Sequence, residues 1–428
     1  MTSFLRLPRT GSGQARGEGV PAGHGVKATP AGPTLVRSER TFEPAVDGLR
    51  AIATCMVLLV HLAQWTGGMI DENGEAGPFA RVMTGFQAAV PIFLIISGYL
   101  LYRPWVDATL SGRAAPKAAH FFWHRFLRVF PAYWLLIVTA LVAFDRDRLG
   151  DTWRTVRLLS AQHVQHWQDL RADPGVVSHW AQTWTIGTEI HFYLALPLVA
   201  FVLHRVLTLR HGTRVSLALL AGVAVLDVIW LVSTTPSDPF GPPSLWWLRG
   251  YLGFLAAGMA FAIVAGRAAA TGRHTAAERL VARHPWVCWG VALIALAMAN
   301  TDWAGSVVDP AVLTKTEATV RYVCHMLIAA GLAAPLLLAR GSGPELLLSR
   351  PVPQWLGRNS YGIYLWHLVI MQVLVRHVMD GEYARLDTGD FFVLLPFVTL
   401  LSILAGWLSY TLVERPVLRR FRIRRLPR

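Results

Sequence analysis

The sequence is poor in charged residues and in cysteine. Asp, Glu, Lys and Arg make up 15% of its 428 residues, whereas soluble proteins carry roughly 25%. The three cysteines, Cys55, Cys288 and Cys324, all lie in apolar stretches. An odd set of this kind predicts no disulfide framework, and it does not have the spacing of a metal site. We therefore expect neither disulfides nor a bound metal.

Apolar residues are abundant, at 54% of the chain. They gather in segments of about 20 residues, the length that crosses a bilayer as a helix. The segments cover residues 45–65, 86–104, 126–144, 184–204, 215–233, 245–266, 284–301, 320–339, 360–379 and 391–413. The sequence predicts an all-α integral membrane protein, a bundle of about ten transmembrane helices. We expect a disordered tail over 1–43, a membrane domain over 44–417 and a basic tail over 418–428.

The basic residues indicate membrane topology rather than nucleic-acid binding. The net charge is +14, but arginine and lysine lie in short clusters between apolar segments. The clusters follow every second segment, so the positive-inside rule places both termini in the cytoplasm. The long connection 145–183 is rich in aromatic residues and is expected to lie at the outer interface. Arginine outnumbers lysine, as is typical of GC-rich bacterial genomes, and with the apolar segments this predicts a multi-pass protein of a bacterial cytoplasmic membrane. The first apolar segment is too long for a signal peptide and has no small-residue cleavage site, so we expect it to remain as a span. We expect no attached soluble domain, because few residues follow the last apolar segment.

The first apolar segment carries Arg50 and His61. Ionisable groups inside a membrane helix are costly and indicate function. These two residues are eleven positions apart, which places them on one helix face within roughly 20° and about 16 Å apart along the axis. An anion-binding fork below a titratable base suits an elongated anionic ligand. The alternative is that Arg50 is an interfacial anchor and His61 a hydrogen-bonded bundle histidine.

Glu189 lies in the fourth segment, at a depth similar to that of His61 by residue count. A carboxylate beside an imidazole would orient it and raise its basicity, as a general base requires. The alternative is a neutral Glu189 bonded to backbone. Arg125 and Arg128 open the third segment and share one helix face, where they are able to bind phosphate oxygens.

Other polar residues fall inside predicted spans. Ser97, Tyr133 and His367 are further site candidates. Asp227 and Arg249 are expected to neutralise each other as a structural pair between neighbouring helices.

Several stretches together resemble the membrane acyltransferase-3 family over residues 44 to 417. They are Asp47–Ala51 with His61, Phe93–Leu101, Arg125–Trp134, Trp184–Tyr193, Ser360–His367 and Glu414–Pro416. The resemblance implies a ten-helix core and transfer of an acyl group from a coenzyme A thioester to a hydroxyl, usually on a sugar. Glu189 matches the first acidic residue of a family stretch, but Ile190 and His191 replace the glutamate and glutamine that follow it.

The resemblance implies a functional Arg50–His61 pair and a donor-binding role for Arg125 and Arg128. We therefore expect an acyl-CoA-dependent O-acyltransferase, with acetyl-CoA as donor and a hydroxyl-bearing glycan or metabolite as acceptor. His61 would be the catalytic base, oriented by Glu189, and Arg50 would assist donor binding. The main alternative is a transporter or flippase of a glycan or anionic substrate, whose fold commonly shows inverted repeats; we find no such repeat in this sequence.

Overall fold

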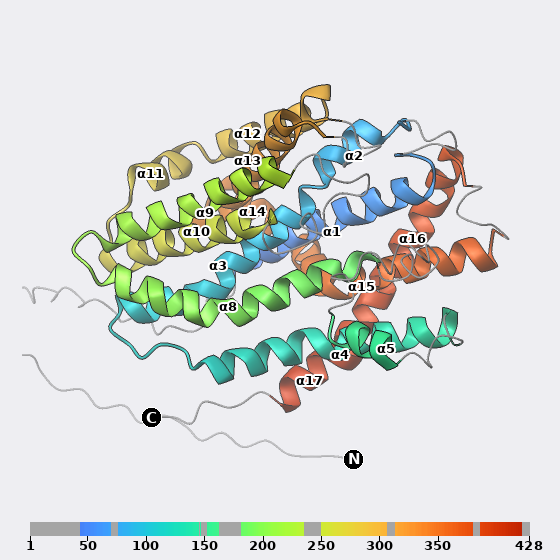
Figure 1. Cartoon of the computed structure of the whole chain (residues 1–428), viewed down its shortest axis with the longest axis horizontal. Helices are drawn as coiled ribbons and strands as arrows, with labels where there is room; N and C mark the ends of the chain where they lie inside the picture. Colours follow the sequence, from blue (N-terminus) through green and yellow to red (C-terminus); the bar gives the residue numbers. More distant parts are fainter. Residues whose placement is uncertain are drawn as a thin grey trace, which may run out of the picture. The chain divides into compact units, whose positions relative to one another are not determined.

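The computed structural model describes residues 43–69, 76–144, 146, 152–161, 181–234, 250–305, 313–379 and 386–421. These residues form helices and no β-strand (Figure 1). The α-helices are α1 Pro44–Trp65, α2 Ala80–Phe86, α3 Ala89–Leu110, α4 Ala118–Phe144, α5 Thr152–Leu159, α8 Trp184–Leu207, α9 Gly212–Thr234, α10 Leu252–Thr271, α11 Ala276–Arg283, α12 Pro285–Ala299, α13 Lys315–Leu338, α14 Gly343–Leu348, α15 Pro351–His377, α16 Thr388–Ser409 and α17 Arg415–Arg420. A π-helical turn, Tyr410–Glu414, joins α16 to α17.

Helices are the expected solution for an apolar chain, because a helix satisfies its own backbone hydrogen bonds without water. Eight helices are long and apolar enough to cross a membrane, and a ninth crossing results if α11 and α12, bent by 88°, form one broken span. These counts refer to the described ranges. Each of the ten predicted segments coincides with a helix, and the all-helical membrane fold is confirmed.

Two helices begin well before their predicted starts. α4 begins at Ala118 rather than near residue 126, and α15 begins at Pro351 rather than near residue 360. Hydropathy locates only the part of a helix that lies in hydrocarbon, whereas the helix continues through polar residues beyond it. As a result, Arg125 and Arg128 lie inside α4 and not at its end. Of the predicted outer connection 145–183, α5 is described, and residues 145, 147–151 and 162–180 lie outside the described residues.

α1 lies at the centre of the bundle. It packs along α15 and also contacts α3, α14 and α16, while α3 packs on α10 and α15 on α16 (Figure 1). Glycines permit the close approach of α15 and α16: a Cβ on Gly362 would lie 2.7 Å from the Cα of Gly406. Small residues at such crossings are typical of membrane bundles. This packing brings residues of α1 into contact with residues of α15, far along the chain.

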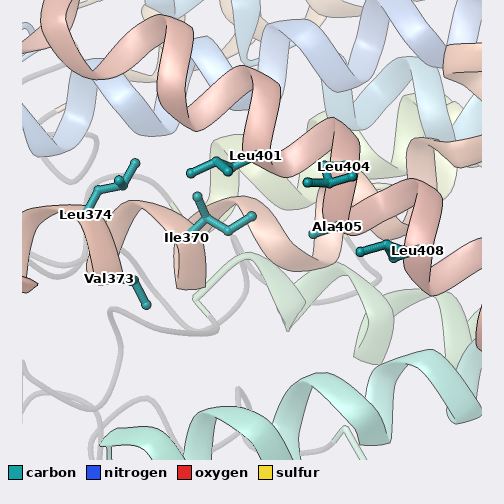
Figure 2. A pocket seen from close by; sticks show the side chains of 7 residues that line it. All are labelled: Ile370, Val373, Leu374, Leu401, Leu404, Ala405 and Leu408. Carbon is teal, nitrogen blue, oxygen red and sulfur yellow. The ribbon is translucent and has the colours of Figure 1, made fainter.

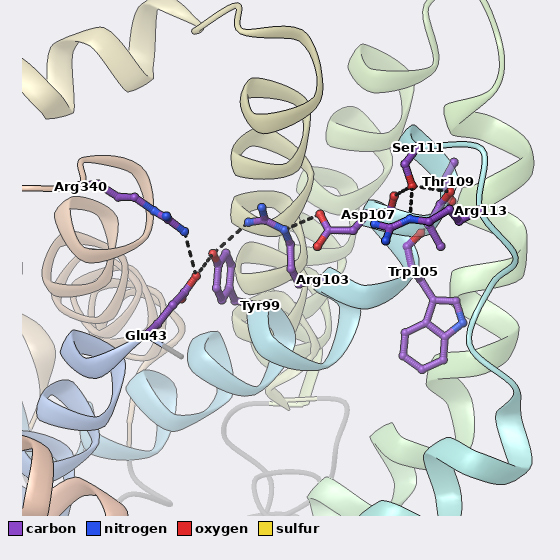
Figure 3. A network of polar contacts seen from close by, with 10 residues as sticks. Glu43, Tyr99, Arg103, Trp105, Asp107, Thr109, Ser111, Arg113 and Arg340 are labelled. Carbon is purple, nitrogen blue, oxygen red and sulfur yellow. Dashed lines mark hydrogen bonds and ion pairs between the residues drawn. The ribbon is translucent and has the colours of Figure 1, made fainter. Parts of the chain in front are cut away.

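A polar network holds the start of α1 against α3 and the connection after α13 (Figure 3). The Tyr99 hydroxyl donates to Glu43 at 2.9 Å and accepts from the Arg103 guanidinium at 3.0 Å. Arg103 also donates to Asp107 at 2.7 Å, and the guanidinium of Arg340 lies 3.9 Å from the Glu43 carboxylate. We call these residues the Glu43 network.

Removing the Tyr99 hydroxyl should destabilise the protein, and more so at alkaline pH. Burial raises the pKa of Glu43 above its ordinary value of 4.5, and the Tyr99 hydrogen bond opposes that rise. A raised pKa makes the contribution of Glu43 to stability greatest below about 4.5, and this contribution is lost as the pH rises through the folded-state pKa. In Tyr99→Phe the buried carboxylate loses a donor, at a cost of about 1–3 kcal/mol. Thermal unfolding in detergent should show a larger deficit at pH 8 than at pH 5.

The matched control for this variant is Tyr102→Phe. Tyr102 is buried on the same helix, at 1% exposure, so its loss removes the same atom from α3. An equal deficit at both pH values in Tyr99→Phe would contradict a role of the hydroxyl in solvating the Glu43 carboxylate.

α15 and α16 also line an open apolar pocket of about 250 Å³ (Figure 2). Its lining residues are Ile370, Val373, Leu374, Leu401, Leu404, Ala405 and Leu408. None of these side chains offers a hydrogen bond or a charge, so the pocket provides no group for chemistry.

Candidate active site

His61 of α1 and His367 of α15 form an imidazole pair inside the bundle. Nδ1 of His61 lies 2.9 Å from Nε2 of His367, and the ring centroids are 5.0 Å apart. His367 is 2% exposed, and its Nδ1 lies 2.7 Å from the carbonyl oxygen of Tyr364. His61 is only partly buried. We call these two residues the histidine pair, of which His61 is the more accessible member.

Arg50 of α1 and Arg125 and Arg128 of α4 belong to a second polar centre, which we call the arginine cluster. Arg128 lies within electrostatic range of Arg50, and both are within range of Glu414. The Arg50 guanidinium lies 3.9 Å from the Asp47 carboxylate. Since like charges repel in a medium of low dielectric constant, these carboxylates offset the repulsion between the arginines.

Glu189 of α8 joins the arginine cluster. One of its carboxylate oxygens accepts from the Tyr193 hydroxyl and the other from Ser97 Oγ at 3.4 Å. Glu189 is within electrostatic range of Arg50, and Tyr193 is within range of both α4 arginines. The sequence analysis selected Glu189 and Ser97 as candidates independently of each other. In the structure both lie at the arginine cluster that is predicted to bind the donor.

Glu189 is not hydrogen-bonded to His61, the pairing that would orient the imidazole if the two helices met. No hydrogen bond joins these two side chains, both of which the structure describes; His61 is bonded to His367 and to the backbone of Val57. The similar depth of Glu189 and His61 was obtained by counting residues from the start of each helix. Such a count assumes parallel helices, and it does not show which helices pack together. α15, and not α8, packs along α1.

The comparisons with known proteins identify the family. A family model described as an acyltransferase domain matches residues 43–411. The chain belongs to the acyltransferase-3 family. This confirms the resemblance inferred from the sequence motifs.

The relatives are named as acyltransferases of bacteria. The chain is 26% identical over 404 residues to a putative peptidoglycan O-acetyltransferase, YrhL, of Bacillus subtilis, covering 88% of this chain and 55% of the relative. It is 24% identical over 372 residues to the peptidoglycan O-acetyltransferase OatA of Listeria monocytogenes, covering 78% and 50%. It is also 26% identical over 390 residues to the acyltransferase MdmB of Streptomyces mycarofaciens, covering 88% and 92%. The chain thus spans about half the length of the first two relatives. No solved structure matches.

Tyrosines near the family motifs connect helices. The buried Tyr133 hydroxyl of α4 donates to the carbonyl of Leu158 in α5 at 2.5 Å. The Tyr361 hydroxyl of α15 donates to the carbonyl of Val129 in α4 at 2.9 Å. Tyr133 was a site candidate by its position in the sequence only. Because its hydroxyl is bonded to backbone, we assign it to the support of α4 rather than to the chemistry.

The structure describes only Asp227 of the expected Asp227–Arg249 pair. It accepts from the backbone N–H of Gly253 at 2.6 Å and from the Tyr322 hydroxyl at 3.2 Å, while Arg249 lies outside the described residues. Backbone and phenol donors therefore satisfy the buried carboxylate. Over the described ranges, no three His, Cys, Asp or Glu side chains gather in a metal-binding arrangement.

Sequence reasoning assigned no role to Tyr193 and Glu414. Glu414 is 3% exposed, ends the π-helical turn and lies within electrostatic range of Arg50 and Arg128. Glu414 could have been selected from the sequence, because it is an acidic residue at the end of an apolar segment. The same argument, that an ionisable group in such a segment indicates function, selected Glu189. Single π-turns are frequent at functional sites, because the extra residue redirects a side chain.

Proposed function

We propose that this protein is a membrane O-acyltransferase that moves an acetyl group from acetyl-CoA to a hydroxyl of a sugar, a surface glycan or a secondary metabolite. The observation that carries the proposal is the arrangement on α1, where Arg50 belongs to the arginine cluster and His61 to the histidine pair. The two residues are eleven positions apart, or about 16 Å along the helix axis.

The arginine cluster suits the phosphates of coenzyme A. Guanidinium groups bind phosphate oxygens through paired, charge-assisted hydrogen bonds. Arg50 Nε is buried and has no hydrogen-bond partner among the described residues, which leaves it available to a ligand. We propose that Arg50, Arg125 and Arg128 hold the donor, and that Glu189 and Glu414 keep the arginines in place.

At the other end of the site, His61 would act as general base. It takes the proton from the acceptor hydroxyl as the oxygen attacks the thioester carbonyl. The new C–O bond forms, the C–S bond breaks, and the proton passes from the imidazolium to the departing thiolate of coenzyme A. Exclusion of water by the bundle would limit hydrolysis of the thioester.

The named peptidoglycan O-acetyltransferases support a glycan acceptor. Since the chain has helices long and apolar enough to cross a membrane, we expect the acceptor hydroxyl to react at or within the bilayer boundary.

The proposal is tested with the full chain in proteoliposomes. Labelled acetyl-CoA is supplied with peptidoglycan fragments or lipid-linked sugars, and both free thiol and labelled glycan are measured. We expect covalent label on the glycan together with release of coenzyme A. Movement of an unmodified glycan across the vesicle wall without a new covalent product would instead support a transporter.

A further inference from the structure

We propose that His367 is a positioning residue, which sets the tautomer of His61 so that Nε2 of His61 receives the proton from the acceptor. The proposal rests on the proposed acyl transfer, because it names how the base of that reaction is held. It is independent of Glu189, whose carboxylate is bonded to Ser97 and Tyr193 instead.

The tautomers follow from the contacts. Nδ1 of His367 lies 2.7 Å from the carbonyl oxygen of Tyr364. A carbonyl only accepts, so Nδ1 of His367 carries a hydrogen, and Nε2 of a neutral His367 is then an acceptor. Nε2 lies 2.9 Å from Nδ1 of His61, which is therefore the donor within the pair, and His61 also makes a hydrogen bond with the backbone of Val57. In a neutral His61 this leaves a lone pair on Nε2, the atom that a general base uses.

The surroundings of His367 make this arrangement rigid. Its ring is 2% exposed, so the hydrogen bond is shielded from competing water. The supporting Tyr364 is itself held, since its hydroxyl donates to the carbonyl of Gln182 and lies 2.7 Å from Thr185 Oγ1. The Gln182 amide in turn donates to the carbonyl of Leu365 at 2.7 Å. The chain of contacts resembles the arrangement of a catalytic histidine whose Nδ1–H is held by a third group.

The pair also favours the charged state that forms during transfer. When Nε2 of His61 takes the proton, its Nδ1–H becomes part of a cation. The hydrogen bond to His367 is then charge-assisted and stronger. A neutral acceptor at this position stabilises the imidazolium without placing a fixed negative charge in the bundle.

The test compares His367→Leu with His367→Gln in the full-length protein. Leucine removes the acceptor, whereas the side-chain oxygen of glutamine is able to accept from Nδ1 of His61. We expect His367→Leu to lower kcat by about 10²–10⁴-fold, the range for loss of a base or its correct tautomer. The KM and the Kd for acetyl-CoA should stay unchanged in both variants, and His367→Gln should recover most of the activity. Equal kcat in wild type and His367→Leu, or no recovery in a folded His367→Gln, would overturn the proposal.

A second measurement does not depend on activity. In ¹⁵N-histidine-labelled wild type, the His61 resonances are identified by their loss in His61→Gln. We expect a protonated Nδ1 and an unprotonated Nε2 at a pH where the ring is neutral. The opposite tautomer would overturn the proposal even if His367→Leu failed to fold. A positive NMR result without acetyl transfer would instead contradict the proposed function and leave the histidine pair intact.

Discussion

Replacing His61 with alanine should reduce acetyl transfer by about 10²–10⁴-fold, the usual contribution of a general base. The acetyl-CoA affinity should remain nearly unchanged, because the proposed donor contacts belong to the arginine cluster at the other end of α1. The measurement pairs the rate of acceptor-dependent thiol release with equilibrium binding of labelled acetyl-CoA in detergent.

The control for this variant is His204→Ala. His204 lies on the membrane helix α8, and its Nδ1 lies 2.9 Å from Thr109 Oγ1, away from both polar centres. We expect it to retain transfer. Wild-type turnover in His61→Ala would exclude His61 as the base, whereas loss of acetyl-CoA binding in the same variant would assign it to the donor site.

The second large effect is expected in the double variant Arg125→Ala, Arg128→Ala. A hydrogen bond to a charged group contributes about 1.5–3 kcal/mol, and 1.4 kcal/mol corresponds to about tenfold in Kd. Loss of both guanidinium groups should weaken acetyl-CoA binding by about 100-fold or more. Because the contacts are to phosphates, free coenzyme A should lose affinity to a similar extent.

The matched control is Arg205→Ala, Arg210→Ala. Both residues lie near the end of α8, on the side of the membrane that the arginine distribution also predicts to be cytoplasmic. This variant removes the same total charge, so it measures the non-specific electrostatic contribution to binding. Equal weakening in the two double variants would mean that Arg125 and Arg128 are not a specific donor site.

Features set by local chain geometry could be predicted from the sequence. Ten apolar segments of spanning length predicted ten helices, because a helix in hydrocarbon must satisfy its own backbone. The common face of Arg50 and His61 follows from the helical repeat alone. The family could also be recognised, since its motifs are short ordered runs that need no tertiary information.

Residue-to-residue pairing across helices could not be predicted in this way. His61 meets His367 because α1 packs along α15, and Glu189 meets Ser97 because α8 packs against α3. Hydrophobic periodicity shows which face of a helix is apolar. It does not show which helix packs against that face, or how the two helices are rotated relative to each other.

The membrane-helical architecture, the family and most of the buried polar residues, though not Tyr193 and Glu414, thus follow from the order of amino acids alone. Packing between helices divides that set into an arginine cluster and a histidine pair, and it puts His367 rather than Glu189 beside His61. The physical reason is that the free-energy cost of burying a charged or polar group is evident from the apolar residues that flank it in the sequence. The partner that offsets this cost comes from a distant segment of the chain, and only the packing of the helices determines which one.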